Sequence, residues 1–323
     1  LLLRYLKKIF YNSVAELRSL CFLNERLKNI FLKNRDMRFI KMTGGLGNQM
    51  FIYAFYMRMK KHYSNTRIDL SDMVHYKAHN GYEMHRVFNL PPIEFRINQP
   101  LKKVIEFLFF KKIYERKQIP SSLVPYDKKY FWPLLYFKGF YQSERFFADM
   151  ADDIRKAFTF NPRLSNRKTK EMSEQIDHDE NAVSIHVRRG DYLEPKYWKT
   201  TGCVCQLPYY LNAITEMNKR ISQPSYYVFS DDIAWVKENL PLPKAFFIDW
   251  NKGTESWQDM MLMSRCRHHI ICNSTFSWWG AWLNPRENKT VIMPERWFRH
   301  CETPDICPDK WIKVPINQPD SIQ

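Results

Sequence analysis

Two arginines stand directly after an apolar run of the chain. Residues 182–187 are followed by Arg188 and Arg189 and then by Asp191, in the stretch "AVSIHVRRGDY". Guanidinium groups at the end of a buried segment are unfavourable unless an anion meets them, and the arginine fork binds phosphate oxygens in pairs. The pattern favours a diphosphate site at Arg188. The alternative is a structural ion pair with Asp191.

A second candidate anion site lies in "HHIICNSTFSWWGAW", residues 268–282. The apolar run ends in Asn273, and Ser274 or Thr275 can cap the aromatic helix that follows. The free N–H groups of a first helical turn, with the helix dipole behind them, attract an anion. The alternative is an ordinary helix cap with its aromatic residues in a core.

Other chemistry-bearing side chains also follow apolar runs, and each has a structural alternative. Asp231 and Asp232 suit ribose hydroxyls, whereas a shared metal is disfavoured because adjacent residues of a strand face opposite ways. His186 alternates with apolar neighbours, as a core histidine would. Asp259 fits base recognition or capping of its own helix. Ser230 and Asp249 complete the set.

A glycine-rich turn occurs near the start of the chain. "TGGLGNQMF", residues 43–51, follows a short predicted strand at 38–42 and precedes a predicted helix. This layout brings backbone N–H groups against a ligand, with Gly45 and Gly47 giving close approach, although the spacing is not that of the dinucleotide fingerprint.

These residues need a scaffold that gathers strand ends. From residue 181 onward, apolar strands alternate with helices of ten or so residues, which predicts a parallel sheet covered on both faces. In such sheets ligands bind at the carboxyl ends of the strands. Residues 67–72 are predicted to form the next strand after the glycine turn. Residues 139–147 are predicted to lead into a further helix.

Bulk properties narrow the class of protein. The chain has 323 residues, 45% of them hydrophobic, and a net charge of +16. Residues 1–41 contribute +7 and residues 102–129 contribute +5, so the positive charge is not spread over one reading surface. This argues for contact with anionic membranes or acidic polymers and only weakly for nucleic acid.

The cysteines and the first residues bear on location. Seven cysteines without paired spacing predict reduced thiols and a cytoplasmic setting. No apolar stretch of about eighteen residues occurs, so no membrane span is expected. Residues 1–36 read as a basic helix that either packs on the body or lies on the inner face of the membrane.

Four ordered motifs together resemble the alpha-1,2-fucosyltransferases, glycosyltransferase family 11. They are "GGLGNQMF", "HVRRGDY", "FSDD" and "DMMLMSRCRHHIICNSTFSWW", and the resemblance covers residues from about 38 to 300. It implies an α/β fold of GT-B-like type, with two facing Rossmann-like domains. We expect a basic helical extension at 1–36, an acceptor-side domain at 37–160 with a basic insertion near 100–130, and a donor-binding domain at 161–323.

The resemblance also implies roles for particular residues. Arg188 should hold the diphosphate of GDP-fucose, and Ser274 and Thr275 should cap it. Asp259 should accept hydrogen bonds from guanine, and Asn48 should reach across the cleft toward the fucose or diphosphate. The remaining implied donor contacts are His186, Asp191, Ser230, Asp231, Asn273, Phe276, Gly45 and Gly47.

The implied mechanism is metal-independent and inverts the anomeric carbon. Arg188 and helix N–H groups would stabilise the departing GDP, so that no metal and no cofactor are expected and GDP-fucose is a donor substrate. For the proton of the acceptor hydroxyl, Asp191 is the first candidate base, with Glu144 and His186 in reserve; the resemblance also allows a mechanism with no dedicated base.

The sequence therefore predicts a galactoside alpha-1,2-fucosyltransferase acting on a β-galactoside glycan of a bacterial surface polysaccharide, as in O-antigen biosynthesis. One alternative keeps the donor site and changes the acceptor or linkage. The other is a basic, non-catalytic protein that binds anionic polymers or membranes. Residues 73–98 and 100–145 should determine acceptor choice, but they contain no readable code.

Overall fold

The computed structural model describes residues 38–74, 76, 79–91, 93, 96–97, 136–300 and 303–316. The segment 1–36 and the basic stretch 102–129 lie outside these described residues, and so do the predictions made for them. Within the described part of the chain, no helix has both the length and the apolar character needed to span a bilayer.

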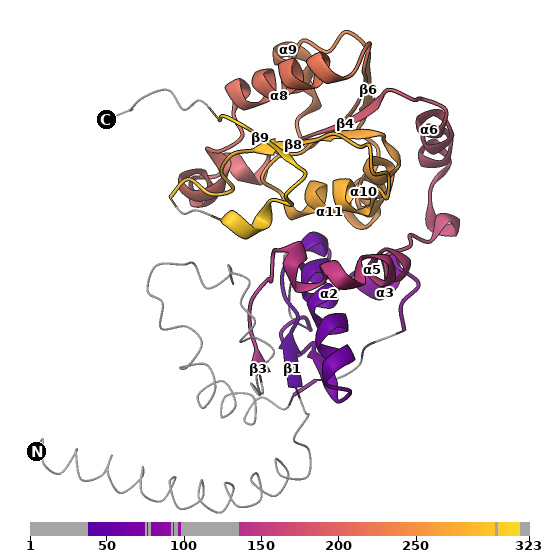
Figure 1. Ribbon diagram of the computed structural model, residues 1–323, viewed down its shortest axis with the longest axis vertical. Coiled ribbons are helices and arrows are strands. Elements are labelled where there is room, and N and C mark those ends of the chain that lie inside the picture. Colours follow the sequence, from indigo (N-terminus) through magenta and orange to yellow (C-terminus); the bar gives the residue numbers. More distant parts are fainter. Residues whose placement is uncertain are drawn as a thin grey trace, which may run out of the picture.

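Two parallel β-sheets organise the described residues (Figure 1). The smaller sheet has the order β2-β1-β3 and consists of β1 (Arg38–Lys41), β2 (Thr66–Asp69) and β3 (Tyr136–Phe137). The larger sheet has the order β6-β5-β4-β7-β8-β9 and consists of β4 (Ala182–Val187), β5 (Ser225–Ser230), β6 (Ala245–Ile248), β7 (His268–Ile270), β8 (Val291–Pro294) and β9 (Ile312–Val314). The expected α/β fold with parallel sheets is confirmed.

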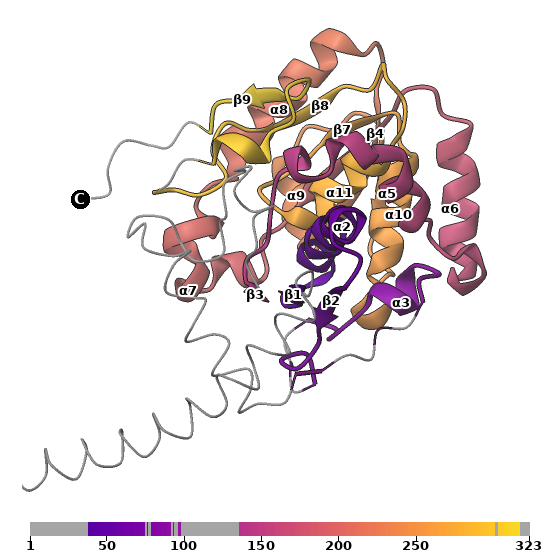
Figure 2. The same ribbon diagram turned by 60° about the horizontal axis from the view of Figure 1, so that its bottom comes forward.

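The helices fall into the same two groups. We call residues 38–160 the N-terminal half; its helices are α2 (Leu46–His62), α3 (Met84–Val87) and α5 (Ala151–Ala157). We call residues 161–316 the C-terminal half; its helices are α6 (Arg167–Asp177), α7 (Pro195–Tyr197), α8 (Leu207–Arg220), α9 (Ile233–Asn239), α10 (Trp257–Arg265) and α11 (Thr275–Leu283). In both views α10 and α11 lie against the N-terminal half, beside α2 (Figures 1 and 2).

Local chemistry explains where several helices begin. The Asn166 side chain accepts from the N–H of Thr169 at the start of α6 (2.9 Å), and Asp232 accepts from Trp235 at the start of α9 (3.1 Å). Such caps satisfy N–H groups that have no partner inside the helix. Strand β4 is almost wholly buried, as a central parallel strand must be: Val183, Ile185 and Val187 form one apolar face, and Ser184 and His186 lie on the other.

The boundaries differ from the prediction in a few places. Helix α2 begins at Leu46, inside the glycine turn, and β2 ends at Asp69 rather than at residue 72. Strand β7 is shorter than its apolar run, because the chain leaves the sheet after Ile270. Strands β3 and β9 were not expected from the sequence; each has only two or three residues, too few for a hydrophobic period to register.

A hydrophobic core crosses from one half to the other. Phe51 of α2 lies with its ring 4.5 Å from Trp278 and 4.9 Å from Trp279 of α11, measured between ring centroids. Phe147 stacks on Trp279 at 5.5 Å. All four side chains are essentially buried. The two sheets are therefore held in a fixed relation by aromatic packing rather than by a thin linker alone.

Candidate active site

A cavity of about 940 Å³ lies between the two halves. Its wall takes residues from the glycine turn and residues 79–83 of the N-terminal half, and from the carboxyl ends of β4, β5, β6 and β7 of the C-terminal half. Apart from the reserve base Glu144 and the ribose candidate Asp232, the structure brings together here the residues that the sequence predicted for the site, namely Gly45, Gly47, Asn48, His186, Arg188, Asp191, Ser230, Asp231, Asp259, Asn273, Ser274, Thr275 and Phe276.

Arg188 enters the cavity from the end of β4. Its Nε donates to Asp191 Oδ1 (2.9 Å) and its Nη2 donates to Asp191 Oδ2 (2.8 Å), and its guanidinium lies 4.9 Å from the centre of the Tyr192 ring. The ion pair between Arg188 and Asp191, the alternative considered from the sequence, is therefore present. It leaves the third guanidinium nitrogen, Nη1, without a hydrogen bond to the described residues. The arginine is held in place with one donor face still open to an anion.

Asp191 is less suited to act as a base than the sequence suggested. Although partial burial opposes it, the hydrogen bonds and charge of Arg188 lower the pKa of the Asp191 carboxyl below its ordinary value. Both of its oxygens are engaged by the guanidinium. We therefore read Asp191 as the residue that orients Arg188.

Arg189 turns away from the cavity. Its Nε donates to Asp232 (3.1 Å) and its guanidinium lies 4.1 Å from the centre of the Trp235 ring. Its backbone N–H donates to Asp231 Oδ1 (2.8 Å). Of the two adjacent arginines, only Arg188 lines the cavity, and Asp231 and Asp232 both serve as partners of Arg189.

Two helix N-termini converge on the cavity wall from opposite halves. Ser274 is the N-cap of α11, and its Oγ accepts from the N–H of Phe276 (3.4 Å). Helix α2 starts after Gly45 with no side-chain cap. A Cβ added at Gly47 would lie 2.6 Å from Thr275 Oγ1 and 2.8 Å from the Phe276 nitrogen, so the two first turns touch. Both positive dipole ends therefore meet at one place, as an anion site requires.

A carboxyl group lies in another part of the cavity, on the first turn of α10. Asp259 Oδ1 accepts from Asn251 Nδ2 (2.8 Å), and burial raises the pKa of Asp259 to about 7. The side chain does not bond the N–H groups of its own helix in the structure, so the capping alternative is not realised. A half-ionised acceptor in a cavity suits a ligand that offers N–H donors.

His186 is neutral under ordinary conditions. Burial and the charge of Arg188 lower its pKa to about 3, and its Nδ1 lies 3.2 Å from the Cys272 sulfur. Its ring centre is 5.9 Å from that of Phe276. So weak a base does not suit proton abstraction from a sugar hydroxyl, and the reserve role as base is not supported.

The remaining predicted residues combine structural bonds with exposure to the cavity. Asn273 donates through Nδ2 to the Thr201 and Trp297 carbonyls (2.9 and 3.0 Å), while its buried Oδ1 has no partner among the described residues. Ser230 Oγ accepts from the N–H of Asp232 (2.9 Å). Asn48 Oδ1 accepts from Gln142 Nε2 (2.8 Å), which fixes its orientation beside the glycine turn.

Glu144, a reserve base in the sequence analysis, is not among the residues that line the cavity. Its Oε2 accepts from the indole N–H of Trp282 (3.0 Å) on α11. The residue therefore helps to join the two halves and does not face the site.

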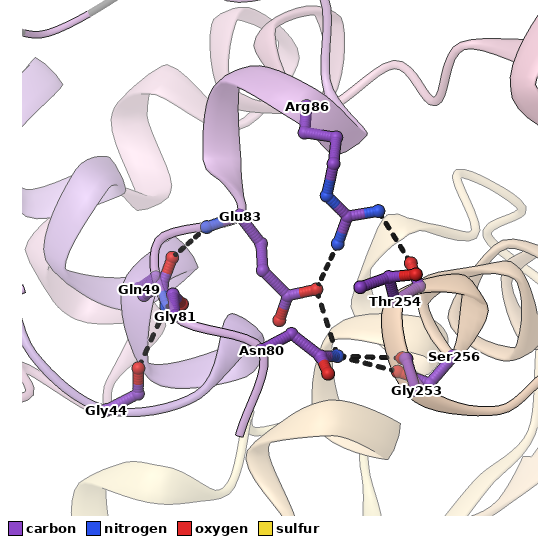
Figure 3. Close-up of polar contacts among 9 residues, drawn as sticks. All are labelled: Gly44, Gln49, Asn80, Gly81, Glu83, Arg86, Gly253, Thr254 and Ser256. Atoms are coloured by element: carbon purple, nitrogen blue, oxygen red, sulfur yellow. Dashed lines mark hydrogen bonds and ion pairs between the residues drawn. The ribbon is translucent and has the colours of Figure 1, made fainter. Parts of the chain in front are cut away.

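Sequence reasoning missed a group of N-terminal residues on the cavity wall: His79, Asn80 and Glu83. Gln49 ties this segment to the glycine turn, since its Nε2 donates to the Gly44 and Gly81 carbonyls (2.8 and 2.7 Å), as Figure 3 shows. The one signal available in the sequence was Gln49 itself, a polar residue within the apolar start of a helix and wholly buried in the structure.

The same segment bonds across to the C-terminal half (Figure 3). Asn80 Nδ2 donates to the Gly253 carbonyl (2.8 Å), and Arg86 Nη1 donates to the Thr254 carbonyl (2.6 Å). Glu83 is nearly fully buried and accepts from Arg86 Nη2 (2.6 Å) and Asn80 (3.2 Å). Polar bonds between the halves thus close one side of the cavity.

Comparison of the sequence with known proteins finds relatives among sugar transferases. A family model described as Glycosyl transferase family 11 matches residues 20–314. An alpha-1,2-colitosyltransferase of Escherichia coli is 32% identical over 292 residues, 85% of this chain and 97% of the relative.

Two further relatives have similar identities over different lengths. The O-antigen biosynthesis glycosyltransferase WbnK of Escherichia coli is 28% identical over 311 residues, 84% of this chain and 99% of the relative. A galactoside alpha-(1,2)-fucosyltransferase 1 of Ateles belzebuth is 31% identical over 160 residues, 47% of this chain and 43% of the relative.

Proposed function

This chain belongs to glycosyl transferase family 11, and we propose that it transfers L-fucose from GDP-β-L-fucose to the 2-hydroxyl of a galactoside, with inversion and without a metal ion. One observation carries the proposal. Arg188 and the N-termini of α2 and α11 line one cavity between the halves, where they match the diphosphate of a sugar nucleotide.

The proposed chemistry follows from the charges. As the bond between the sugar and the β-phosphate breaks, negative charge builds on the phosphate oxygens and the sugar gains oxocarbenium character. Preorganised donors aimed at that charge are often the largest contribution to catalysis, and losing one typically costs about 10²–10³ in rate. Arg188, held rigid by Asp191, and the two helix N-termini would supply these donors.

The nucleotide end of the proposed site is Asp259. Guanine presents an imino and an amino N–H on one edge, and a carboxylate accepts both, whereas adenine and uracil do not present this pair of donors. Asn251, which bonds Asp259, would keep the carboxyl group aimed at the cavity. This arrangement supports a guanosine diphosphate donor.

A second donor deserves the same test, because the colitosyltransferase relative matches nearly its whole length. Colitose is fucose without the 3-hydroxyl group, so the nucleotide and diphosphate contacts proposed above would serve either sugar. We propose a bacterial surface polysaccharide as acceptor, in keeping with the name of the O-antigen relative. Tyr197, Phe140 and Phe298 line the cavity and offer aromatic faces to sugar rings.

The test is GDP release with lactose as trial acceptor in excess EDTA, run with GDP-fucose, GDP-colitose, GDP-mannose and UDP-galactose. We expect lactose-stimulated release from GDP-fucose that the chelator leaves unchanged, and an α1→2 linkage in the product by NMR. Arg188→Ala should reduce the rate by at least about a hundredfold. A strict need for a divalent ion would contradict the metal-free mechanism.

The same experiment distinguishes this function from the two alternatives, a colitose donor and a non-catalytic binding protein. Faster transfer from GDP-colitose would make colitose the natural donor. Failure to bind GDP, together with salt-dependent binding to anionic polymers that survives Arg188→Ala, would favour the non-catalytic protein instead.

A further inference from the structure

The proposed transfer needs a group that takes the acceptor proton, and most ionisable groups in the cavity are already engaged. Both oxygens of Asp191 bond Arg188, Asp259 accepts from Asn251, and Asp231 accepts from the N–H of Arg189. Glu83 is buried and paired with Arg86 at 2.6 Å. None of these carboxylates is both without a hydrogen-bonding partner and adjacent to Arg188.

His79 has both properties: its ring has no hydrogen bond to the described residues, and it is close enough to Arg188 to feel its charge. It lines the cavity, and its side chain remains exposed there. A Cβ added at Gly45 would lie 3.2 Å from the imidazole ring, so the ring lies against the backbone that begins α2. His79 is thus beside one of the two helix N-termini that we assign to the diphosphate.

The backbone at His79 is unusual. Its φ is +55°, in the left-handed region that non-glycine residues seldom adopt. Residues held in such conformations persist where the surroundings fix them, and they cluster at functional sites. Here the fixing bonds follow directly in the chain: Asn80 bonds Gly253 and Ser256 of the C-terminal half, and the Gly81 carbonyl accepts from Gln49 (Figure 3).

The charges around His79 suit a base at neutral pH. Partial burial and the positive charge of Arg188 lower the pKa of the imidazole, while the charge of Asp191 acts in the opposite direction. The Tyr76 ring also lies near the imidazole, 6.4 Å away between centroids. The imidazole is therefore neutral at pH 7 and able to accept a proton.

We propose that His79 is the general base that activates the acceptor hydroxyl, an inference that rests on the proposed transfer of sugar from a GDP-sugar. The acceptor oxygen forms a bond to the anomeric carbon, and the bond from that carbon to the β-phosphate oxygen breaks. The electron pair of the broken bond leaves with GDP, and the hydroxyl proton passes to an imidazole nitrogen of His79. A glycosidic bond, GDP and an imidazolium result.

The variant His79→Asn tests this role. Asparagine tolerates a positive φ and keeps a polar side chain, but it cannot accept the proton. We expect the turnover number with GDP-fucose and lactose to fall by about 10²–10⁴, while the dissociation constant of GDP changes by less than about threefold. Added imidazole should restore part of the lost rate. His85→Asn, an exposed histidine on α3 outside the cavity, is the matched control and should leave turnover unchanged.

A second measurement uses the wild-type protein and does not depend on the variant folding. At saturating GDP-fucose, kcat/KM for lactose should fall as the pH is lowered, because a protonated imidazole cannot accept the hydroxyl proton. Asp259 is then already engaged by the nucleotide. A flat profile from pH 5 to 8 would overturn the role of His79.

The remaining outcomes are also decisive. Wild-type transfer with unchanged turnover in His79→Asn would contradict the role of His79 alone. Loss of GDP binding together with turnover would make His79 a structural residue and contradict it too. If the wild-type protein transferred nothing from any GDP-sugar, the proposed function itself would fail and this inference with it.

Discussion

At the scale of residues, the site combines groups held in unlike electrostatic states. Arg188 keeps its charge because Asp191 compensates it, whereas His186 is held neutral by burial. Asp259 is only partly ionised at neutral pH, because burial raises its pKa to about 7 and the hydrogen bond from Asn251 offsets this only in part. Environment, rather than residue type, therefore decides which groups are charged when a ligand arrives.

The raised pKa of Asp259 predicts how donor affinity depends on pH. The ionised carboxylate accepts the guanine N–H donors, so GDP-fucose affinity should rise with pH, by roughly tenfold per unit below pH 7, and level off above it. Isothermal titration from pH 5.5 to 8 measures this. In Asp259→Asn, binding should be weaker and this pH dependence should disappear. Equal affinity across the range would contradict the assignment of Asp259 to guanine.

The same shift has a consequence for the ligand-free protein. The folded-state pKa is about 7, above the ordinary value of 3.8, so the folded protein binds more protons than the unfolded chain between these values. The contribution of Asp259 to stability is therefore greatest at low pH and is lost as the pH rises through 7.

At the scale of elements, two helices from different halves share one contact. The Gly47 carbonyl accepts from the Trp279 indole N–H (2.9 Å), while the Gly47 α-carbon abuts the first turn of α11 at Thr275. Glycine is needed here for close approach between two backbones, not for its conformational freedom. The contact couples the start of α2 to the α11 turn that we assign to the diphosphate.

The variant Gly47→Ala tests this coupling, because the contact predicts a decrease in the free energy of unfolding, whereas an open helical position predicts an increase. In an open helical position, alanine would stabilise the fold by about 1 kcal/mol. Against Thr275 we expect instead a loss of about 1–3 kcal/mol and weaker GDP binding, because α11 must shift. Thermal unfolding and GDP titration measure both effects. Gly253→Ala is the control for backbone strain without a clash: an added Cβ meets nothing within 4 Å, but at φ +57° the substitution is strained, by about 1–2 kcal/mol. A more stable Gly47→Ala would contradict the contact.

At the scale of the whole molecule, the two sheets share one aromatic core. Phe51 and Phe147 of the N-terminal half pack against Trp279 and Trp282 of the C-terminal half, with ring centres 4.9–5.5 Å apart in the pairs Phe51–Trp279, Phe147–Trp279 and Phe147–Trp282. A large apolar interface of this kind restricts hinge motion between the halves. Ligands are therefore expected to meet a largely preformed cavity.

The shared core predicts that both halves unfold together. Calorimetry should show one transition, and Phe51→Ala should lower its stability by about 3–5 kcal/mol. Val228→Ala, in the core of the larger sheet, should move the same transition by a smaller amount. Two resolved transitions, with each variant shifting only one of them, would show that the halves are independent.

Much of this protein was readable from the sequence because the relevant physics is local. The alternation of apolar strands and helices after residue 181 predicted the large parallel sheet, and the rule that ligands meet strand ends predicted Arg188, Ser230 and Ser274 at one edge. The sequence also predicted a cap at Ser274 or Thr275, since a cap depends on residues two or three positions away, and the structure has it at Ser274.

Only the tertiary structure decided the rest. Which of Arg188 and Arg189 faces the cavity depends on Asp232 and Trp235, which lie more than forty residues further along the chain. The place of His79 depends on bonds from its neighbours to Gly253 and Gln49. Contacts between distant segments leave no period or spacing in the sequence, because they are set by how the sheets and helices pack, and so they appear only once the chain is folded.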